Sequence, residues 1–180
     1  MPLLNAVTTP YAEALLQVVN ENEQTEEMVS EVKKLLALIN DAPELEKAFS
    51  SPVLETEAKK KIIIELFSDK INSSLFNFLK LLADRQRIGI ITSILNRFLE
   101  IYRENSNIAL ATVTSAVELT DEQKGLITKK IINIAGTEKL ELVTKIDPSL
   151  IGGFVASVGS KVIDASLASQ IRKLGLTLSK

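Results

Sequence analysis

The chain has 180 residues, of which 46% are hydrophobic and 4% aromatic, and its formal net charge is −2. It contains no Cys and no His, which excludes disulfides, Ser-His and Cys-His nucleophiles, imidazole general bases and zinc sites of the usual ligand set. The small net charge argues against a general nucleic-acid binder. We therefore predict a globular, non-enzymatic protein with no catalytic, cofactor or metal site.

Membrane and targeting signals are also missing from the sequence. No apolar run approaches the ~18–20 residues that a membrane-spanning helix needs. No Lys or Arg precedes Lys33, whereas signal and transit peptides carry basic residues. We therefore expect no targeting segment, and contact with a membrane only indirectly, through a larger complex.

Helical periodicity dominates the first 105 residues. Thr9 and Pro10 have the form of a helix cap followed by Pro in the first turn. The predicted helices cover residues 11–20, 25–39, a short piece after Pro43, 55–67, 75–83 and 87–104. Short turns between them predict an antiparallel six-helix bundle over residues 1–105.

The period changes around residues 105–107, where we place a domain boundary. Residues 108–117 are rich in Ala, Thr and Val and predict a strand. Thr120 and Gln123 form a capping-box pattern that opens a helix, and Gly136 is placed to end it. Residues 140–146 alternate as a second strand. The predicted fold class is α+β, with a small sheet-plus-helices domain over residues 106–180.

The stretch from Asp147 to Leu174 has the densest pattern of turn and strand signals. It begins with a turn and continues as a strand over residues 150–158, in which Gly152-Gly153 indicates a bulge or a close backbone contact. Gly159-Ser160 predicts a turn into a second strand over residues 161–164. Leu167, Ile171 and Leu174 then share one face of a predicted helix.

This stretch resembles the C-terminal signature of the delta subunit of F-type ATP synthases, called the oligomycin-sensitivity-conferring subunit in mitochondria. The matching residues are Asp147, Gly152, Gly153, Gly159, Ile163, Asp164 and Ser166. Further segments match the same family in order along the chain: TPYAEALLQV, SPVLETEAKKKIIIELF, FNFLKLLADRQRIGIITSILNRFLEIY and ATVTSAVELTDEQKGLI.

The resemblance implies a non-catalytic stator subunit. In that family the N-terminal domain holds an N-terminal helix of an alpha subunit, and the C-terminal domain meets the b-type stalk subunits. Residues 1–105 are then expected to bind the catalytic head and residues 106–180 the peripheral stalk. This connection would let rotor torque drive ATP synthesis instead of spinning the head. Within this family, the missing transit peptide favours a bacterial, cyanobacterial or plastid-encoded type. Such a protein lies peripherally on the cytoplasmic or stromal face of a plasma or thylakoid membrane.

Two helices have unusually wide apolar faces. The apolar residues span roughly 200° in the helix at residues 11–20 and roughly 180° in the helix at 87–104, against about 100° for an ordinary amphipathic helix. Burial at the centre of the bundle and a groove for a partner helix both account for this width. Members of the family bind the alpha-subunit helix on their first and fifth helices. In this sequence, the helix at residues 87–104 is the sixth predicted helix and not the fifth. The residues implied for such a groove are Tyr11, Leu15, Ile94, Phe98 and Tyr102.

Other patterns in the sequence are weaker indications of function. IGGFVASVGSK is Gly-rich, but Gly153 and Gly159 enclose five residues instead of the four of a phosphate loop, and Ser160-Lys161 reverses its order; a hairpin explains the pattern better. The Lys59–Lys61 run is interpreted as a solvated surface. An unrelated helical adaptor or regulatory module remains the alternative function, with an enzyme third.

Overall fold

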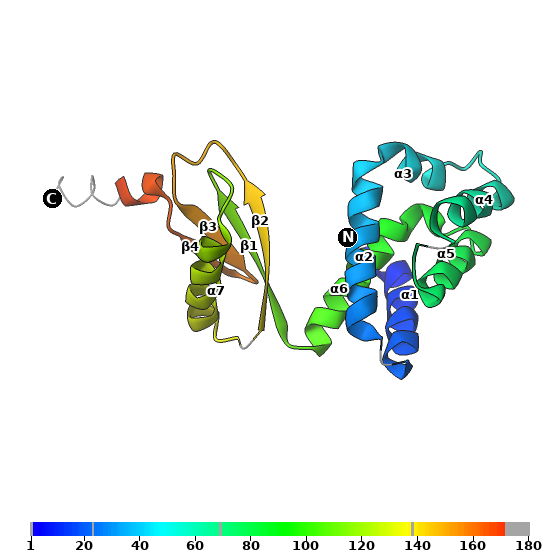
Figure 1. Ribbon diagram of the computed structural model, residues 1–180, viewed down its shortest axis with the longest axis horizontal. Helices are drawn as coiled ribbons and strands as arrows, with labels where there is room; N and C mark the ends of the chain where they lie inside the picture. The colour runs from blue at the N-terminus through cyan, green and yellow to red at the C-terminus, as the bar shows by residue number, and fades with distance from the viewer. Residues whose placement is uncertain (1, 23, 69, 138, 172–180) are drawn as a thin grey trace. The chain divides into compact units, whose positions relative to one another are not determined.

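The computed structural model describes residues 2–22, 24–68, 70–137 and 139–171 (Figure 1). The chain divides into two compact units, Met1–Tyr102 and Arg103–Lys180. The division falls inside the last turn of α6, slightly before the boundary predicted after residue 105. The first unit is helical and the second contains a four-stranded sheet, which confirms the α+β class.

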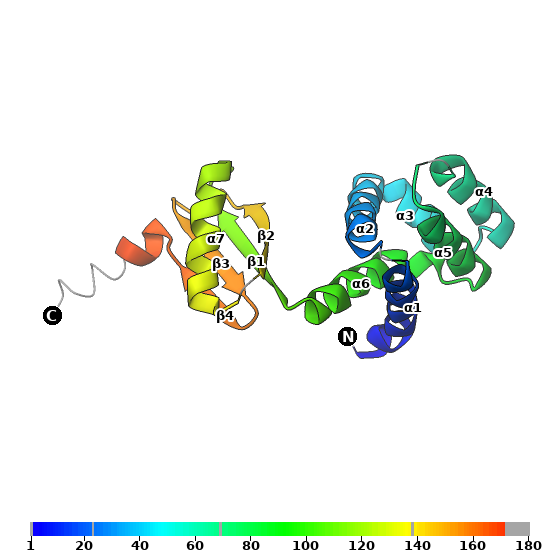
Figure 2. The same cartoon turned by 60° about the horizontal axis from the view of Figure 1, so that its bottom comes forward.

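The first unit consists of α-helices and one 3-10 turn. These elements are α1 (Pro2–Glu21), α2 (Thr25–Asp41), α3 (Pro43–Ser50), α4 (Thr56–Phe67), α5 (Ser73–Asp84), η1 (Ile88–Ile90) and α6 (Ile91–Asn105). Within the unit α4 packs beside α5, and α2 beside α1 (Figure 2). The Asn72 side chain caps α5 by accepting a hydrogen bond from the Ser74 N–H at 2.8 Å, as expected of an N-cap residue.

The start of α1 differs from the prediction. The helix begins at Pro2 and continues through Pro10, instead of beginning after a cap at Thr9. Thr8 is buried, and the hydroxyl of Thr9 accepts a hydrogen bond from Nε of Arg97 on α6. These tertiary contacts hold the preceding turns in helical form even though Pro10 lacks a backbone donor.

The last predicted helix of this unit is also shorter than expected. Residues 88–90 form the 3-10 turn η1, and the α-helix starts only at Ile91. A Cβ on Gly89 would lie 3.0 Å from Cα of Ser50. The turn therefore packs closely on the end of α3, which a glycine at this position allows.

One continuous core fills the helical unit. Its largest fully buried side chains come from α2 through α6 and η1, and they are Met28, Ile39, Phe49, Ile63, Leu75, Leu79, Leu82, Ile88, Ile94, Leu95 and Phe98. Among the described residues, no helix combines the length and apolar character needed to cross a bilayer.

The second unit is built on a sheet of order β2-β1-β3-β4. The strands are β1 (Ile108–Ser115), β2 (Lys139–Ile146), β3 (Phe154–Val158) and β4 (Lys161–Asp164). β1 pairs parallel with β2 and antiparallel with β3, and β3 pairs antiparallel with β4. α7 (Asp121–Ala135) makes the crossover that a parallel β1–β2 pair requires.

The predicted signals at both ends of α7 are confirmed. The Thr120 hydroxyl accepts from the Gln123 N–H at 3.3 Å, and the Gln123 side chain accepts from the Thr120 N–H at 3.0 Å. Gly136 ends the helix in the left-handed conformation, with φ of +73°. Ile127 and Ile131 of α7 pack against the alternating side chains of β1 and β3, and this contact forms the core of the unit.

Two strand predictions were too long. The first strand ends at Ser115, whose hydroxyl donates a hydrogen bond to the carbonyl of Val117, two residues later, at 2.7 Å. The third strand begins at Phe154, because the backbone bends over residues 150–153 and makes no strand pairing there. The predicted terminal helix is present over residues 167–171, and Leu174 lies outside the described residues.

Candidate interaction surfaces

The five residues predicted to form a groove belong to one cluster in the helical unit. Leu15, Ile94 and Phe98 are buried, with exposed fractions of 3%, 0% and 0%. Tyr11 and Tyr102 are half-buried and pack against the same core. The two tyrosines alone therefore reach the surface, while the other three side chains support it from below.

A polar contact links the two helices that carry these residues. Nε of Arg97 on α6 donates to Oγ1 of Thr9 on α1 at 3.3 Å. Nη1 of Arg97 also pairs with Oε2 of Glu100 at 2.9 Å. α1 and α6 thus lie next to each other at the position where a partner helix is predicted to bind, and that binding stays a prediction.

The Gly152-Gly153 pair lies in close backbone contact with the segment after β4. Gly153 has φ of +78°, and a Cβ there would overlap the carbonyl oxygen of Ala165. The Ala165 N–H donates to the carbonyl of Phe154, and the Leu167 N–H to the carbonyl of Gly152, each at 3.0 Å. Glycine is needed where backbones approach this closely.

The polar signature residues form the neighbouring turns. Oδ1 of Asp164 accepts from the Ser166 N–H at 2.9 Å and its hydroxyl at 2.6 Å, and Oγ of Ser166 accepts from the Ser169 N–H at 3.2 Å. Oδ1 of Asp147 accepts from the Ser149 N–H at 2.9 Å. Hydrogen bonds from the side chain and backbone of Ser149 hold the pKa of Asp147 below its ordinary value. These residues shape the backbone, and their carboxylates are engaged in doing so.

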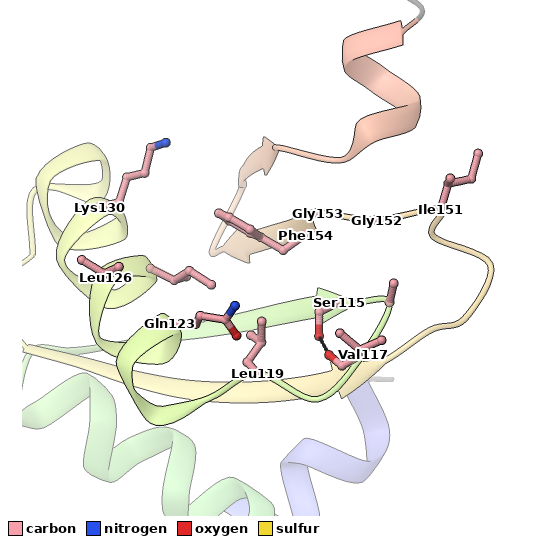
Figure 3. Close-up of a pocket in the computed structure, with 12 residues that line it drawn as sticks. Ser115, Val117, Leu119, Gln123, Leu126, Lys130, Ile151, Gly152, Gly153 and Phe154 are labelled. Carbon is pink, nitrogen blue, oxygen red and sulfur yellow. Dashed lines mark hydrogen bonds between the residues drawn. The ribbon is translucent and has the colours of Figure 1, made fainter.

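Beside the glycine pair lies an apolar cavity of about 610 Å³ (Figure 3). The end of β1 and the loop after it, α7, and the segment entering β3 form its walls. The lining residues are Ser115, Ala116, Val117, Leu119, Gln123, Leu126, Ile127, Lys130, Ile151, Gly152, Gly153 and Phe154. We call this the sheet cavity.

Three large apolar side chains on the wall of the sheet cavity are strongly exposed. The exposed fractions are 70% for Val117, 63% for Leu126 and 75% for Ile151. No motif in the sequence marks these three residues as a site. One signal was available for Leu126, which lies about 100° around α7 from Ile127 and so extends the apolar face beyond the core stripe.

The lining of the sheet cavity is mostly apolar, which suits binding. Lys130 is the one charged residue among those that line it, and Gln123 and Ser115 add neutral polar groups. The Ser115 hydroxyl is already engaged with the carbonyl of Val117. Within the described ranges, no three His, Cys, Asp or Glu side chains are grouped to hold a metal ion.

Comparison with known proteins places the whole chain in one family. The family described as ATP synthase delta (OSCP) subunit matches residues 7–178. The chain belongs to this family. The ATP synthase subunit delta of Prochlorococcus marinus strain AS9601 is 92% identical over 180 residues, with 100% of each chain covered. That of strain MIT 9303 is 57% identical, covering 100% of this chain and 99% of the relative.

The fold is shared with a distant solved structure. A chain in the cryo-EM structure of the Toxoplasma gondii mitochondrial ATP synthase hexamer matches with a TM-score of 0.71 and 18% identity. The match covers 96% of this chain and 97% of that one. At this identity the likeness concerns the fold alone.

The family resemblance found in the sequence is thereby confirmed. As an ATP synthase delta (OSCP) subunit, the chain is a component of the stator, or peripheral stalk, of the F-type ATP synthase, and it is a structural subunit instead of a catalytic one. It associates with other subunits of that complex and is peripheral to its membrane part. The alternative of an unrelated helical adaptor is not supported.

Proposed function

We propose that each unit of this chain binds one side of the stator connection. The helical unit acts as the family's six-helix bundle and holds the N-terminal helix of an alpha subunit of the catalytic head. The second unit binds b-type subunits of the peripheral stalk. The protein then keeps the head from turning with the rotor, so that torque drives ATP synthesis.

We place this connection on the cytoplasmic or stromal face of the energy-transducing membrane, plasma or thylakoid. The similarity to Prochlorococcus marinus, a cyanobacterium, supports the thylakoid. The chain reaches that membrane through its partners, in keeping with the lack of a bilayer-spanning helix among the described residues.

The observation that carries the stalk-binding proposal is the exposed apolar wall of the sheet cavity. Val117, Leu126 and Ile151 leave more than half of their surface in water around one hollow. Large apolar side chains gathered in this way mark binding surfaces more often than scattered single ones do. Covering them with the apolar stripe of a partner helix removes this surface from water.

The polar groups of the sheet cavity favour a helix that carries a carboxylate beside its apolar stripe. The Lys130 ammonium is exposed at the edge and can pair with such a group. The Gln123 side chain is held by the capping box, which fixes its position on the first turn of α7. Both polar groups come from the helix that also supplies Leu126, so one element presents the apolar and polar contacts together.

For the helical unit, the support comes from Tyr11 and Tyr102. Both rings are half-buried against the core of two adjacent helices. A tyrosine at the edge of a groove can bury its ring while its hydroxyl stays hydrated. We propose that these two residues contact the alpha-subunit helix directly, above the buried layer of Leu15, Ile94 and Phe98.

The stalk side is tested by placing a charge on the cavity wall of the full-length chain. Leu126→Glu should weaken binding to purified b-type stalk subunits by at least about tenfold, because it puts a carboxylate against their apolar stripe. The same variant should bind a synthetic alpha-subunit N-terminal peptide normally. Calorimetric titration against each partner measures both affinities.

Ile134→Glu is the matched control for this experiment. Ile134 lies on the same helix and is 45% exposed, but it does not line the sheet cavity. An equal loss of stalk binding in both variants would contradict the assignment of the cavity. Loss of alpha-peptide binding by Leu126→Glu would contradict the division of partners between the two units.

A further inference from the structure

A second apolar cleft, of about 240 Å³, lies on the helical unit between α2 and the end of α4 with the turn that follows it. Its lining residues are Glu31, Lys34, Leu35, Leu38, Leu66, Phe67, Lys70 and Ile71. None of them lies on α1 or α6, so this α2–α4 cleft is separate from the surface proposed for the alpha-subunit helix.

The α2–α4 cleft has a buried floor and an exposed apolar rim. Leu35 and Phe67 belong to the core and form the floor. Leu38 and Leu66 stand at the rim with 46% and 39% of their surface exposed. An anchor that entered the cleft would contact the core side chains below and the two leucines beside it.

The charged groups around the cleft are unequally engaged. Oε2 of Glu31 accepts a hydrogen bond from the Asn72 N–H at 2.9 Å, which occupies this carboxylate with the start of α5. Lys34 and Lys70 are exposed, and neither takes part in the ion pairs found among the described residues. The rim therefore presents two ammonium groups that are available to an acidic partner.

The volume limits what can occupy the cleft. Pockets for small molecules and cofactors usually enclose about 300–1,000 Å³, and this cleft is smaller. It has the size expected for one or two apolar anchor side chains of a helix laid across it. The apolar floor and the cationic rim then require an apolar stripe flanked by carboxylates.

We propose that the α2–α4 cleft is a second docking site, which binds an amphipathic helix carrying Leu or Ile anchors flanked by Asp or Glu. The anchors enter between Leu38 and Leu66, and the carboxylates pair with Lys34 and Lys70. This site is independent of the partner that binds at Tyr11 and Tyr102.

The test uses the full-length chain with methyl labelling and a synthetic helical peptide. The probe has about 16 residues, a length at which helices become marginally stable, with Leu at i and i+4 and Glu at the flanking positions. A second peptide carries Lys in place of each Glu. The acidic peptide should shift the methyl signals of Leu38, Leu66 and Ile71, and should bind about tenfold more tightly than the basic one at low salt.

Leu38→Ala and Leu81→Ala form a matched pair of variants. Both leucines are exposed to the same degree, 46% and 45%, but Leu81 lies on α5 and does not line the cleft. Leu38→Ala should weaken binding of the acidic peptide about fivefold or more, and Leu81→Ala should leave it unchanged. Thermal unfolding of each variant checks that both remain folded.

Three results with the peptides and variants would overturn the proposal. The first is equal affinity for the acidic and basic peptides, and the second is an equal effect of Leu38→Ala and Leu81→Ala. The third is a set of methyl shifts that leaves Leu38 and Leu66 untouched. Vesicles of anionic phospholipid serve as a further probe. If the vesicles bind at the cleft more strongly than the acidic peptide does, the cleft is a membrane-binding surface instead.

Discussion

Gly153 leaves no room for a Cβ beside the carbonyl oxygen of Ala165, and its backbone is left-handed with φ of +78°. This contact holds the segment after β4 against the start of β3, where the Ala165 N–H donates to the carbonyl of Phe154. Phe154 in turn lines the sheet cavity. The glycine therefore fixes one wall of the proposed stalk-binding surface.

Gly153→Ala should destabilise the second unit strongly. The left-handed conformation alone costs a non-glycine residue about 1–2 kcal/mol, and the new methyl group would also collide with backbone that cannot rotate away. We expect a total loss of about 3 kcal/mol or more. Urea unfolding of the full chain, followed by methyl signals of Val113 and Val158, measures it.

Gly159→Ala separates the two contributions to that loss. Gly159 also has a positive φ, of +55°, but a Cβ there would meet no atom within 4 Å. It should therefore cost only about 1–2 kcal/mol. Equal losses in the two variants would mean that the contact with Ala165 adds nothing.

Gly125→Ala should have the opposite sign. Gly125 lies inside α7, and a Cβ there would meet no atom within 4 Å. Alanine in place of glycine in a helix interior stabilises by about 0.5–1 kcal/mol. The urea midpoint of the second unit should rise, and binding to b-type subunits should not change. A lowered midpoint would show that α7 needs flexibility at this point.

Phe98→Ala should act mainly on folding. Its side chain is fully buried in the helical core, so truncation should cost about 3–5 kcal/mol of stability.

Tyr102→Ser should instead weaken binding of the alpha-subunit peptide by about 1–2 kcal/mol, because the ring is lost from the proposed contact. Titration and melting curves of both variants separate the two roles. Normal peptide binding by Tyr102→Ser would place the alpha-subunit site elsewhere.

Acid should remove the stabilising effect of Asp147. Hydrogen bonds from Ser149 hold its pKa below the ordinary value of 3.8, so the folded state favours the ionised carboxylate. The resulting stability is fully present above that ordinary value and is lost as the pH falls through the lowered pKa. The difference in urea midpoint between wild type and Asp147→Ala should therefore be constant near neutral pH and shrink below about pH 4. A difference that persists unchanged in acid would indicate a role independent of charge.

Local signals were sufficient to predict several elements. The capping box of Thr120 and Gln123 and the terminating Gly136 act within a few residues of chain, and the structure has all three as predicted. The start of α1 was missed because burial of Thr8 and the hydrogen bond from Arg97 to Thr9 arise only in the folded unit. Tertiary contacts of that kind leave no local pattern in the sequence.

The sheet cavity was missed for a similar reason. Val117 and Ile151 follow and precede strands that are far apart in the sequence, and each taken alone is an ordinary loop residue. The antiparallel pairing of Ser115 with Phe154 brings these two loops together at the same end of the two central strands. The wide apolar faces of α1 and α6 correctly indicated burial, but the width of a face does not distinguish a core from a groove.

The connection from α6 into the sheet has a mechanical consequence for a stator. The chain leaves α6 at Asn105 and enters β1 at Ile108, and β1 is a central strand that is paired on both sides over residues 111–115. Removing β1 from the sheet would therefore require two ladders of hydrogen bonds to break. The edge strand β4, in contrast, is held by a single ladder of four paired residues. The chain thus enters the second unit on its most extensively paired strand, which is the strand best able to resist being pulled out.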